Sequence, residues 1–263
     1  MELSIIHEYA NKIETYLNLN TFVLALKLLE NKDNVPFSAK RPKKDLGYHL
    51  SLCQALAMSR REGVSLAMLK EDMWCFEPVI GLGLSKAPQY FLEGNNRFPE
   101  TAQTLNAGKN WALSFPHFEI GKYKGITFSP LSKTIFEPNL VILYCAPFQL
   151  TKIMIAINWI DGKDVYCRLS GHAACVYSIV PTLQNNQFQV TIPCMGDRER
   201  AMAQNDELIV SFPIEKLKDL VMGLEALSKI NKGLPIKFTQ MPEYKLSKKY
   251  LKIGKLMGMD LDK

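Results

Sequence analysis

Apolar positions along the chain recur with two different periods, and these periods predict alternating helices and strands. Between Leu3 and Leu17 the apolar residues are spaced three or four apart, which predicts a helix over that range. The run TFVLALKLL that follows is almost continuously apolar, which is typical of a buried strand. The segment NKDNVPFSAKRPKKD comes next, and its two prolines and many charges predict a loop.

The rest of the chain continues this alternation. Strands are expected at VSLAML, GITFSPL, NLVILYC, DVYCRL, QFQVTI and DELIVSF, and helices at residues 45–61, at residues 99–115, at PFQLTKIMIAINWI and at HAACVYSIVPTL. We expect Asp45 to cap the second helix, Gly63 to end it, and Pro181 to stop the last one. This order favours an α/β fold, with α+β as the alternative, in which helices flank one mixed sheet.

Charge separates the end of the chain from the rest. The net charge of the 263 residues is +6, and from Pro213 onwards 11 lysines face 6 acidic residues, a net +5. We therefore expect a single domain over residues 1–230 and a basic extension over residues 231–263. In the extension, YKLSKKYLKIGKLMGMD has the spacing of an amphipathic helix. We expect this helix to pack on the domain, and we do not expect it to bind nucleic acid, because no aromatic stacking platform or DNA-binding motif accompanies it.

The start of the chain and its most apolar segment bear on its location. MELSIIHEYANK lacks a basic region followed by an apolar one, so no signal peptide is predicted. VILYCAPFQLTKIMIAINWI is interrupted by polar residues and falls short of the ~20 apolar residues of a membrane span. We expect a cytoplasmic protein without a membrane span, in which six cysteines are buried thiols, metal ligands or redox groups, not disulfides.

Four of the six cysteines have turn or helix-start settings. These are Cys53, Cys75, Cys175 and Cys194, whereas Cys145 and Cys167 lie in predicted strands and are expected in the core. No CxxC pair is present, so spacing by itself is weak evidence for a metal site.

The segment VTIPCMGDRERAM gives one of these cysteines a particular setting. Cys194 ends a strand, and a helix is predicted to begin at Gly196, with Asp197 capping it and Arg198 adding positive charge. A helix start stabilises negative charge, so this setting favours a thiolate at Cys194 or a bound anion.

Several segments together resemble a known family. YHLSLCQALAMSR, MWCFEPVIGLGL, SPLSKTIFEPNLVILYCAPFQLTKIM, SGHAACVYSIVPTL and VTIPCMGDRERAMAQNDELIVSFP are similar, in this order, to the blocks of domain of unknown function 169, an uncharacterised family of archaea and anaerobic bacteria. The resemblance implies that Cys53, Cys75, Cys175 and Cys194 form one site, with Gly196, Asp197 and Arg198 in a shared CxGDR block. It supplies no activity.

Three functions are compatible with these residues. Four thiolates suit an iron–sulfur cluster or zinc, and the anaerobic setting that the resemblance implies favours a 4Fe–4S cluster, for electron transfer with an unknown redox partner or for binding a small molecule. Trp74, Phe76 and Tyr177 would then form a dry shell around the cluster. The alternatives are a thiol enzyme with His172 or His49 as base, or an anion-binding module that uses the Gly196 turn and the loop of residues 40–44.

Overall fold

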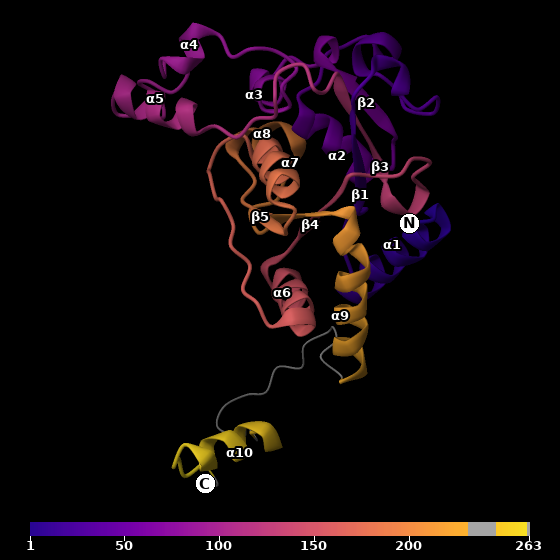
Figure 1. Cartoon of the computed structure of the whole chain (residues 1–263), viewed down its shortest axis with the longest axis vertical. Helices are drawn as coiled ribbons and strands as arrows, with labels where there is room; N and C mark the ends of the chain where they lie inside the picture. Colours follow the sequence, from indigo (N-terminus) through magenta and orange to yellow (C-terminus); the bar gives the residue numbers. More distant parts are fainter. Residues whose placement is uncertain (231–245, 262–263) are drawn as a thin grey trace. The chain divides into compact units, whose positions relative to one another are not determined.

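A six-stranded sheet lies at the centre of the larger part of the chain (Figure 1). The computed structural model describes residues 1–230 and 246–261. By its contacts the chain divides into two compact units, Met1–Lys232 and Gly233–Lys263. Its strands are β1 (Leu24–Leu29), β2 (Leu66–Leu69), β3 (Gly125–Pro130), β4 (Leu140–Cys145), β5 (Gln189–Thr191) and β6 (Leu208–Pro213), in the spatial order β2-β3-β1-β4-β6-β5.

Neighbouring strands of the sheet are all antiparallel. Parallel pairing among the described residues is confined to two isolated bridges, Lys40 with Leu66 and Leu50 with Met73. The predicted class, helices flanking one sheet, is confirmed, but the sheet is antiparallel and not mixed as predicted, because alternation of elements along the chain does not fix strand direction.

Helices cover both faces of the sheet and give three layers (Figure 1). Alternate residues of each strand point to opposite faces, so Tyr144 of β4 belongs to one core and its neighbour Cys145 to the other. The first core is completed by α2 (Leu52–Glu62), α3 (Phe76–Gly81), α4 (Gln89–Leu92), α5 (Leu105–Ser114) and α7 (Ala174–Asn185). The second is completed by α1 (Leu3–Leu17), α6 (Pro147–Asp161) and α9 (Leu217–Lys229). A short helix, α8 (Met195–Ala201), packs against α2.

The start of α2 differs from the prediction. Ser51 caps this helix, accepting a hydrogen bond from the Gln54 N–H at 3.2 Å, and the Gln54 side chain accepts one from the Ser51 N–H at 2.9 Å. Asp45 instead lies in a π-helical turn, Pro42–Leu46, where its carboxylate accepts from the Arg41 N–H at 2.6 Å. Gly63 ends α2 in a left-handed conformation with φ 73°, as predicted.

Two other predicted elements are corrected. Pro181 lies inside α7, which continues to Asn185, because the helix is held by its packing on β5 and β6 despite the missing N–H. Residues 164–169, predicted as a strand, have no regular structure. The Gln189 side chain takes the place of a strand partner there, accepting from the Arg168 N–H at 3.2 Å and donating to the Arg168 carbonyl at 2.7 Å.

The second unit is described only in its C-terminal part. The predicted amphipathic helix starts at residue 244, and residues 231–245 lie outside the described residues. From Lys248 to Leu256 the chain forms helix α10. None of the helices described is both long enough and apolar enough to span a membrane.

Candidate functional site

The four predicted site cysteines each lie in the first turn of a helix. Cys53 and Cys175 are the second residues of α2 and α7, and Cys75 and Cys194 are the N-cap residues of α3 and α8. Helix α2 packs against α8 and α3 packs against α7, and the four helices lie near one another beside the sheet (Figure 1). Cys53 itself packs on Ala57 and on Ala201 of α8.

Backbone N–H groups at these helix starts act on three of the four thiols. The N–H groups of Ala174 and Asp197 act on Cys194, that of Glu77 acts on Cys75, and each lowers the pKa of the thiol it faces. These N–H groups have no partner within their own helix, so a sulfur atom is a natural acceptor.

The thiols also have side-chain partners. The Cys75 thiol donates to Glu77 Oε2 at 2.9 Å, and the Cys194 thiol donates to Asp197 Oδ2 at 3.3 Å. The Cys53 sulfur lies 3.1 Å from the Ser51 hydroxyl oxygen. Within residues 1–230 and 246–261, no three His, Cys, Asp or Glu side chains are arranged to hold a metal ion. The role of the four cysteines as metal ligands therefore stays a prediction.

Burial raises the pKa of all four thiols. It raises the pKa of Cys53 to about 12, with a further contribution from the negative charges of Asp197 and Cys194. The pKa of Cys175 is raised well above its ordinary value by burial and then by the charges of Cys53, Asp197, Cys75 and Cys194. The other three site cysteines therefore each contribute to the raised pKa of Cys175. Cys194 also has a raised pKa, because burial and Asp197 outweigh the helix start, so the expected thiolate is not favoured in the metal-free protein.

Asp197 connects Cys194 to a buried polar network. Besides the thiol, its carboxylate accepts a hydrogen bond from the Tyr144 hydroxyl at 3.2 Å. The Arg60 guanidinium lies 3.9 Å from the centre of the Tyr144 ring and makes two hydrogen bonds to Glu207, at 2.9 and 3.1 Å. The expected capping role of Asp197 is corrected: α8 begins at Met195, with Cys194 at the N-cap and no side-chain cap.

The other two members of the CxGDR block have separate contacts. Arg198 donates to the Gln204 carbonyl at 2.6 Å, and the arginine whose charge acts on Cys75 and Cys194 is Arg97. A Cβ added to Gly196 would lie 3.7 Å from Cys194 Sγ, an ordinary contact.

Arg97 is a site residue that the sequence did not reveal. It is 9% exposed, its Nη2 donates to Glu77 Oε1 at 3.4 Å, and its guanidinium lies 3.8 Å from the centre of the Trp111 ring. Its Nη1 lies 3.1 Å from His172 Nδ1. The segment GNNRFPE carries only turn residues around this arginine, so no local signal identified it.

The histidines and aromatic residues that the sequence placed near the site differ in their contacts and exposure. His172 contacts Arg97, and burial followed by the Arg97 charge lowers its pKa, whereas His49 is exposed. Trp74 and Phe76 are 48% and 46% exposed, so the expected dry shell is wrong for both, while Tyr177 is buried.

The remaining cysteines and the basic loop lie apart from this site. Cys145 is buried in the core on the opposite face of the sheet, as predicted, and burial raises its pKa to about 12. Cys167 lies outside any strand, where its sulfur accepts from the Val190 N–H at 3.1 Å. In the basic loop, Arg41 is bound by Asp72 Oδ2 at 2.7 Å and is not free for a ligand.

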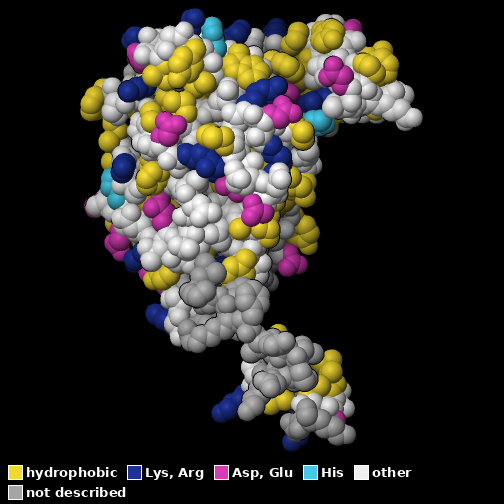
Figure 2. All heavy atoms as spheres, turned by 180° about the vertical axis from the view of Figure 1, so that it is seen from behind, with side chains coloured by type: hydrophobic (Ala, Val, Ile, Leu, Met, Phe, Trp, Pro, Cys, Tyr) yellow, Lys and Arg dark blue, Asp and Glu magenta, His cyan; other side chains and the backbone are white. Residues whose placement is uncertain are grey.

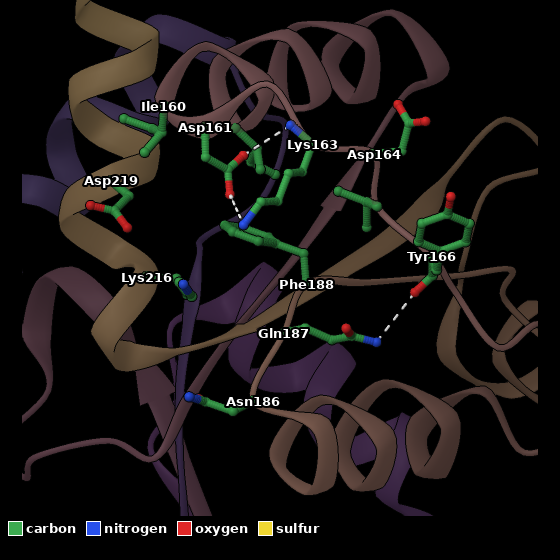
Figure 3. A pocket seen from close by; sticks show the side chains of 12 residues that line it. Ile160, Asp161, Lys163, Asp164, Tyr166, Asn186, Gln187, Phe188, Lys216 and Asp219 are labelled. Carbon is green, nitrogen blue, oxygen red and sulfur yellow. Dashed lines mark hydrogen bonds and ion pairs between the residues drawn. The ribbon is translucent and has the colours of Figure 1, made fainter.

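Charged groups elsewhere on the surface are mixed in sign. On the face shown in Figure 2, Lys and Arg side chains are interspersed with Asp and Glu. A hollow between α6, α9 and the start of β5 contains Asp161, Asp164 and Asp219 together with Lys163 and Lys216 (Figure 3). None of the four site cysteines lines this hollow.

Comparison with known proteins gives one family match. The sequence matches the family model described as DUF169, uncharacterised ArCR, over residues 12–223, a range that includes all four helix starts. It is also similar to a relative from Methanocaldococcus jannaschii named uncharacterized protein MJ0308, with 23% identity over 228 residues. That alignment covers 86% of this chain and 96% of the relative. No solved structure matches.

Proposed function

This chain belongs to the DUF169 family, and from the arrangement of its cysteines we propose that it is a metal-binding protein that carries a 4Fe–4S cluster. Cys53, Cys75, Cys175 and Cys194 would supply the four thiolates. The cluster would serve electron transfer or the binding of a small substrate.

One observation carries this proposal: the four thiols lie at four separate helix starts, two of them buried and two partly buried, and the charges of the other three raise the pKa of Cys175. Without a cation their mutual repulsion and burial keep them protonated. A bound metal removes that repulsion and stabilises the thiolates, and metal binding releases the thiol protons. Four buried thiols need no such arrangement if they serve only as packing groups.

The choice of a cluster over zinc rests on the anaerobic setting that the family resemblance implies, and the surroundings of the sulfur atoms are compatible with it. Backbone N–H groups lower the pKa of Cys53, Cys75 and Cys194, and hydrogen bonds to sulfur are one determinant of cluster potential. Arg97 adds a positive charge that acts on Cys75 and Cys194. Tetrahedral zinc uses the same four donors and is the alternative that the experiment separates.

Access to the proposed centre would be from the side of α3. Cys75 and Cys194 are only partly buried, and the exposed Trp74 and Phe76 flank Cys75 on both sides along the chain. A redox partner or small molecule would approach there. A thiol enzyme is less well supported, because a nucleophilic cysteine needs a lowered pKa and all four are raised.

The test is metal analysis of the full chain purified without oxygen. We expect iron and sulfide in the protein and a broad visible absorption that bleaches on reduction. Changing any of the four cysteines to serine, for example Cys194→Ser or Cys175→Ser, is expected to remove most of the metal. Cys145→Ser is the matched control, since it alters a buried cysteine on the other face of the sheet and should leave the metal content unchanged.

Three results would contradict the proposal. If the protein contains zinc and no iron, the four cysteines bind a structural metal ion and not a cluster. Absence of bound metal after anaerobic purification and reconstitution with iron and sulfide would overturn the metal site altogether. Equal metal loss in Cys145→Ser and Cys194→Ser would show that the loss reflects folding and not ligation.

A further inference from the structure

A group of buried N–H donors beside the cysteines has no acceptor. Arg97 Nε, Trp111 Nε1 and the Asn96 amide nitrogen are all buried without a hydrogen-bond partner in the structure, as is the Asn96 amide oxygen. Arg97 and Trp111 are in direct contact, with the guanidinium 3.8 Å from the centre of the ring, and Asn96 precedes Arg97 in the chain. Buried donors of this kind cost stability unless an acceptor satisfies them.

The other atoms of the Arg97 guanidinium are only partly paired. Nη2 reaches Glu77 Oε1 at 3.4 Å, a long contact, and Glu77 also receives the Cys75 thiol through its other oxygen. Nη1 points to His172 Nδ1 at 3.1 Å, which makes that nitrogen the acceptor and leaves the imidazole neutral. The cationic group is therefore buried against one long carboxylate contact, and its Nε–H has no acceptor.

The surroundings favour an organic monoanion over a dianion. The acidic side chain that Arg97 contacts is Glu77, whose charge would repel a doubly charged ligand. Around Trp111 lie the rings of Phe91, Phe115 and His172, with centroids 5.6, 5.0 and 5.9 Å away. Phe91 and Phe115 also line a neighbouring apolar cavity of about 320 Å³, although Asn96, Arg97 and Trp111 do not line it.

We propose that Arg97 and Trp111, with Asn96, bind the carboxylate of a small organic acid next to the four-cysteine site. Carboxylate oxygens supply the acceptors that Arg97 Nε and Trp111 Nε1 lack, and the apolar rings contact the body of the acid. Small organic acids would then be the substrate class of the proposed metal centre, and this part alone rests on the proposed function. Binding of the carboxylate itself needs no metal.

The experiment follows the indole N–H resonances of the ¹⁵N-labelled full chain. The three tryptophans give three such resonances, and Trp111→Phe assigns the one of interest. Benzoate, acetate, inorganic phosphate and chloride are titrated separately. We expect benzoate and acetate to shift the Trp111 resonance in a saturable manner, benzoate more tightly, and phosphate and chloride to have little effect.

Two arginine variants provide the comparison. Arg97→Gln should weaken benzoate binding about tenfold or more, the usual effect of losing a hydrogen bond to a charged group. Arg200→Gln is the matched control, because Arg200 lies 5.4 Å from the Trp74 ring on the surface, and it should leave the titration unchanged. If Arg97→Gln does not fold, Arg97→Lys keeps the charge but not the planar fork, and it should also weaken binding.

The outcomes separate this inference from the proposed function. If no carboxylate shifts the Trp111 resonance, or if the resonance shifts equally in Arg97→Gln, the carboxylate site is overturned. That result does not bear on the metal site, which is tested separately by metal content. Tighter binding of phosphate than of either carboxylate overturns the assignment of ligand class. If the cysteine variants lose the metal but still bind benzoate, the carboxylate site is supported as a site that does not depend on the metal.

Discussion

The two faces of the sheet bury different kinds of side chain, although the same strands supply both. Behind Cys145, helices α1, α6 and α9 enclose a core that is almost entirely apolar. On the Tyr144 side, the core contains Cys175, with Cys194 packed against it, and buried beside it are an arginine and a carboxylate. A one-residue step along β4 therefore takes the chain from an apolar core to one with buried polar groups. Buried cysteines lie on both faces, so burial does not distinguish the proposed ligands from Cys145.

The largest expected difference between the faces comes from removing one carboxylate on each. Glu207→Ala leaves Arg60, which is 1% exposed, without its partner and should cost about 3–5 kcal/mol of unfolding free energy. Glu225→Ala on the other face removes a half-buried partner of Lys12, which Glu8 also holds, and should change stability little. Urea denaturation measures both. Equal losses of unfolding free energy would show that the buried Arg60–Glu207 pair contributes no more to stability than the partly exposed Lys12–Glu225 pair.

Each face also contains a glycine at a close helix contact. A Cβ at Gly81 would lie 2.4 Å from Val176 Cγ1, and one at Gly223 would lie 2.1 Å from the Ala156 carbonyl oxygen. Alanine at either position should lower the free energy of unfolding by about 1–3 kcal/mol. The loss should be larger for Gly223→Ala, because the backbone of Ala156 can move away less easily than the side chain of Val176. Gly196→Ala meets only ordinary contacts and should leave the thermal midpoint unchanged. A large loss in Gly196→Ala would mean that α8 packs more tightly than the structure shows.

The effect that is smallest at neutral pH concerns one buried thiol from each face of the metal-free protein. Burial raises the pKa of Cys53 and Cys145 from 9.0 to about 12. Between these values the folded state keeps protons that the unfolded state has lost, so stability is full below pH 9 and falls as pH rises towards 12. Each thiol contributes a slope of about 1.4 kcal/mol per pH unit, which Cys53→Ala or Cys145→Ala should remove. Denaturation at several pH values tests this, and an unchanged slope in both variants would contradict it.

Local patterns predicted the elements better than their arrangement. The pattern of apolar residues predicted the bounds of α1 and the positions of the six strands of the sheet, because each signal lies within one segment, but it also predicted a strand at residues 164–169 that does not form. The strand order depends on pairings such as Leu24 with Pro130, which no local pattern encodes. The starts of α2 and α5 were misplaced because loops with polar residues contain several candidate caps.

The candidate site was predicted only in part for the same reason. The helix-start settings of Cys75 and Cys194 were visible as turns in the sequence. Arg97 and Tyr144 reach the cysteines through tertiary packing, from a loop and from a central strand. Neither has a distinctive sequence context, so only the fold connects them to the site.

The two outer strands of the sheet are also its shortest, with four residues in β2 and three in β5. Their outer backbone groups are partly engaged, by the Lys40 main chain beside β2 and by the Cys167 sulfur beside β5. An open strand edge is a template for pairing with other chains and hence for aggregation. By keeping both edges short and partly occupied, the fold offers little backbone for another molecule to extend the sheet, which favours a protein that stays dispersed at high concentration.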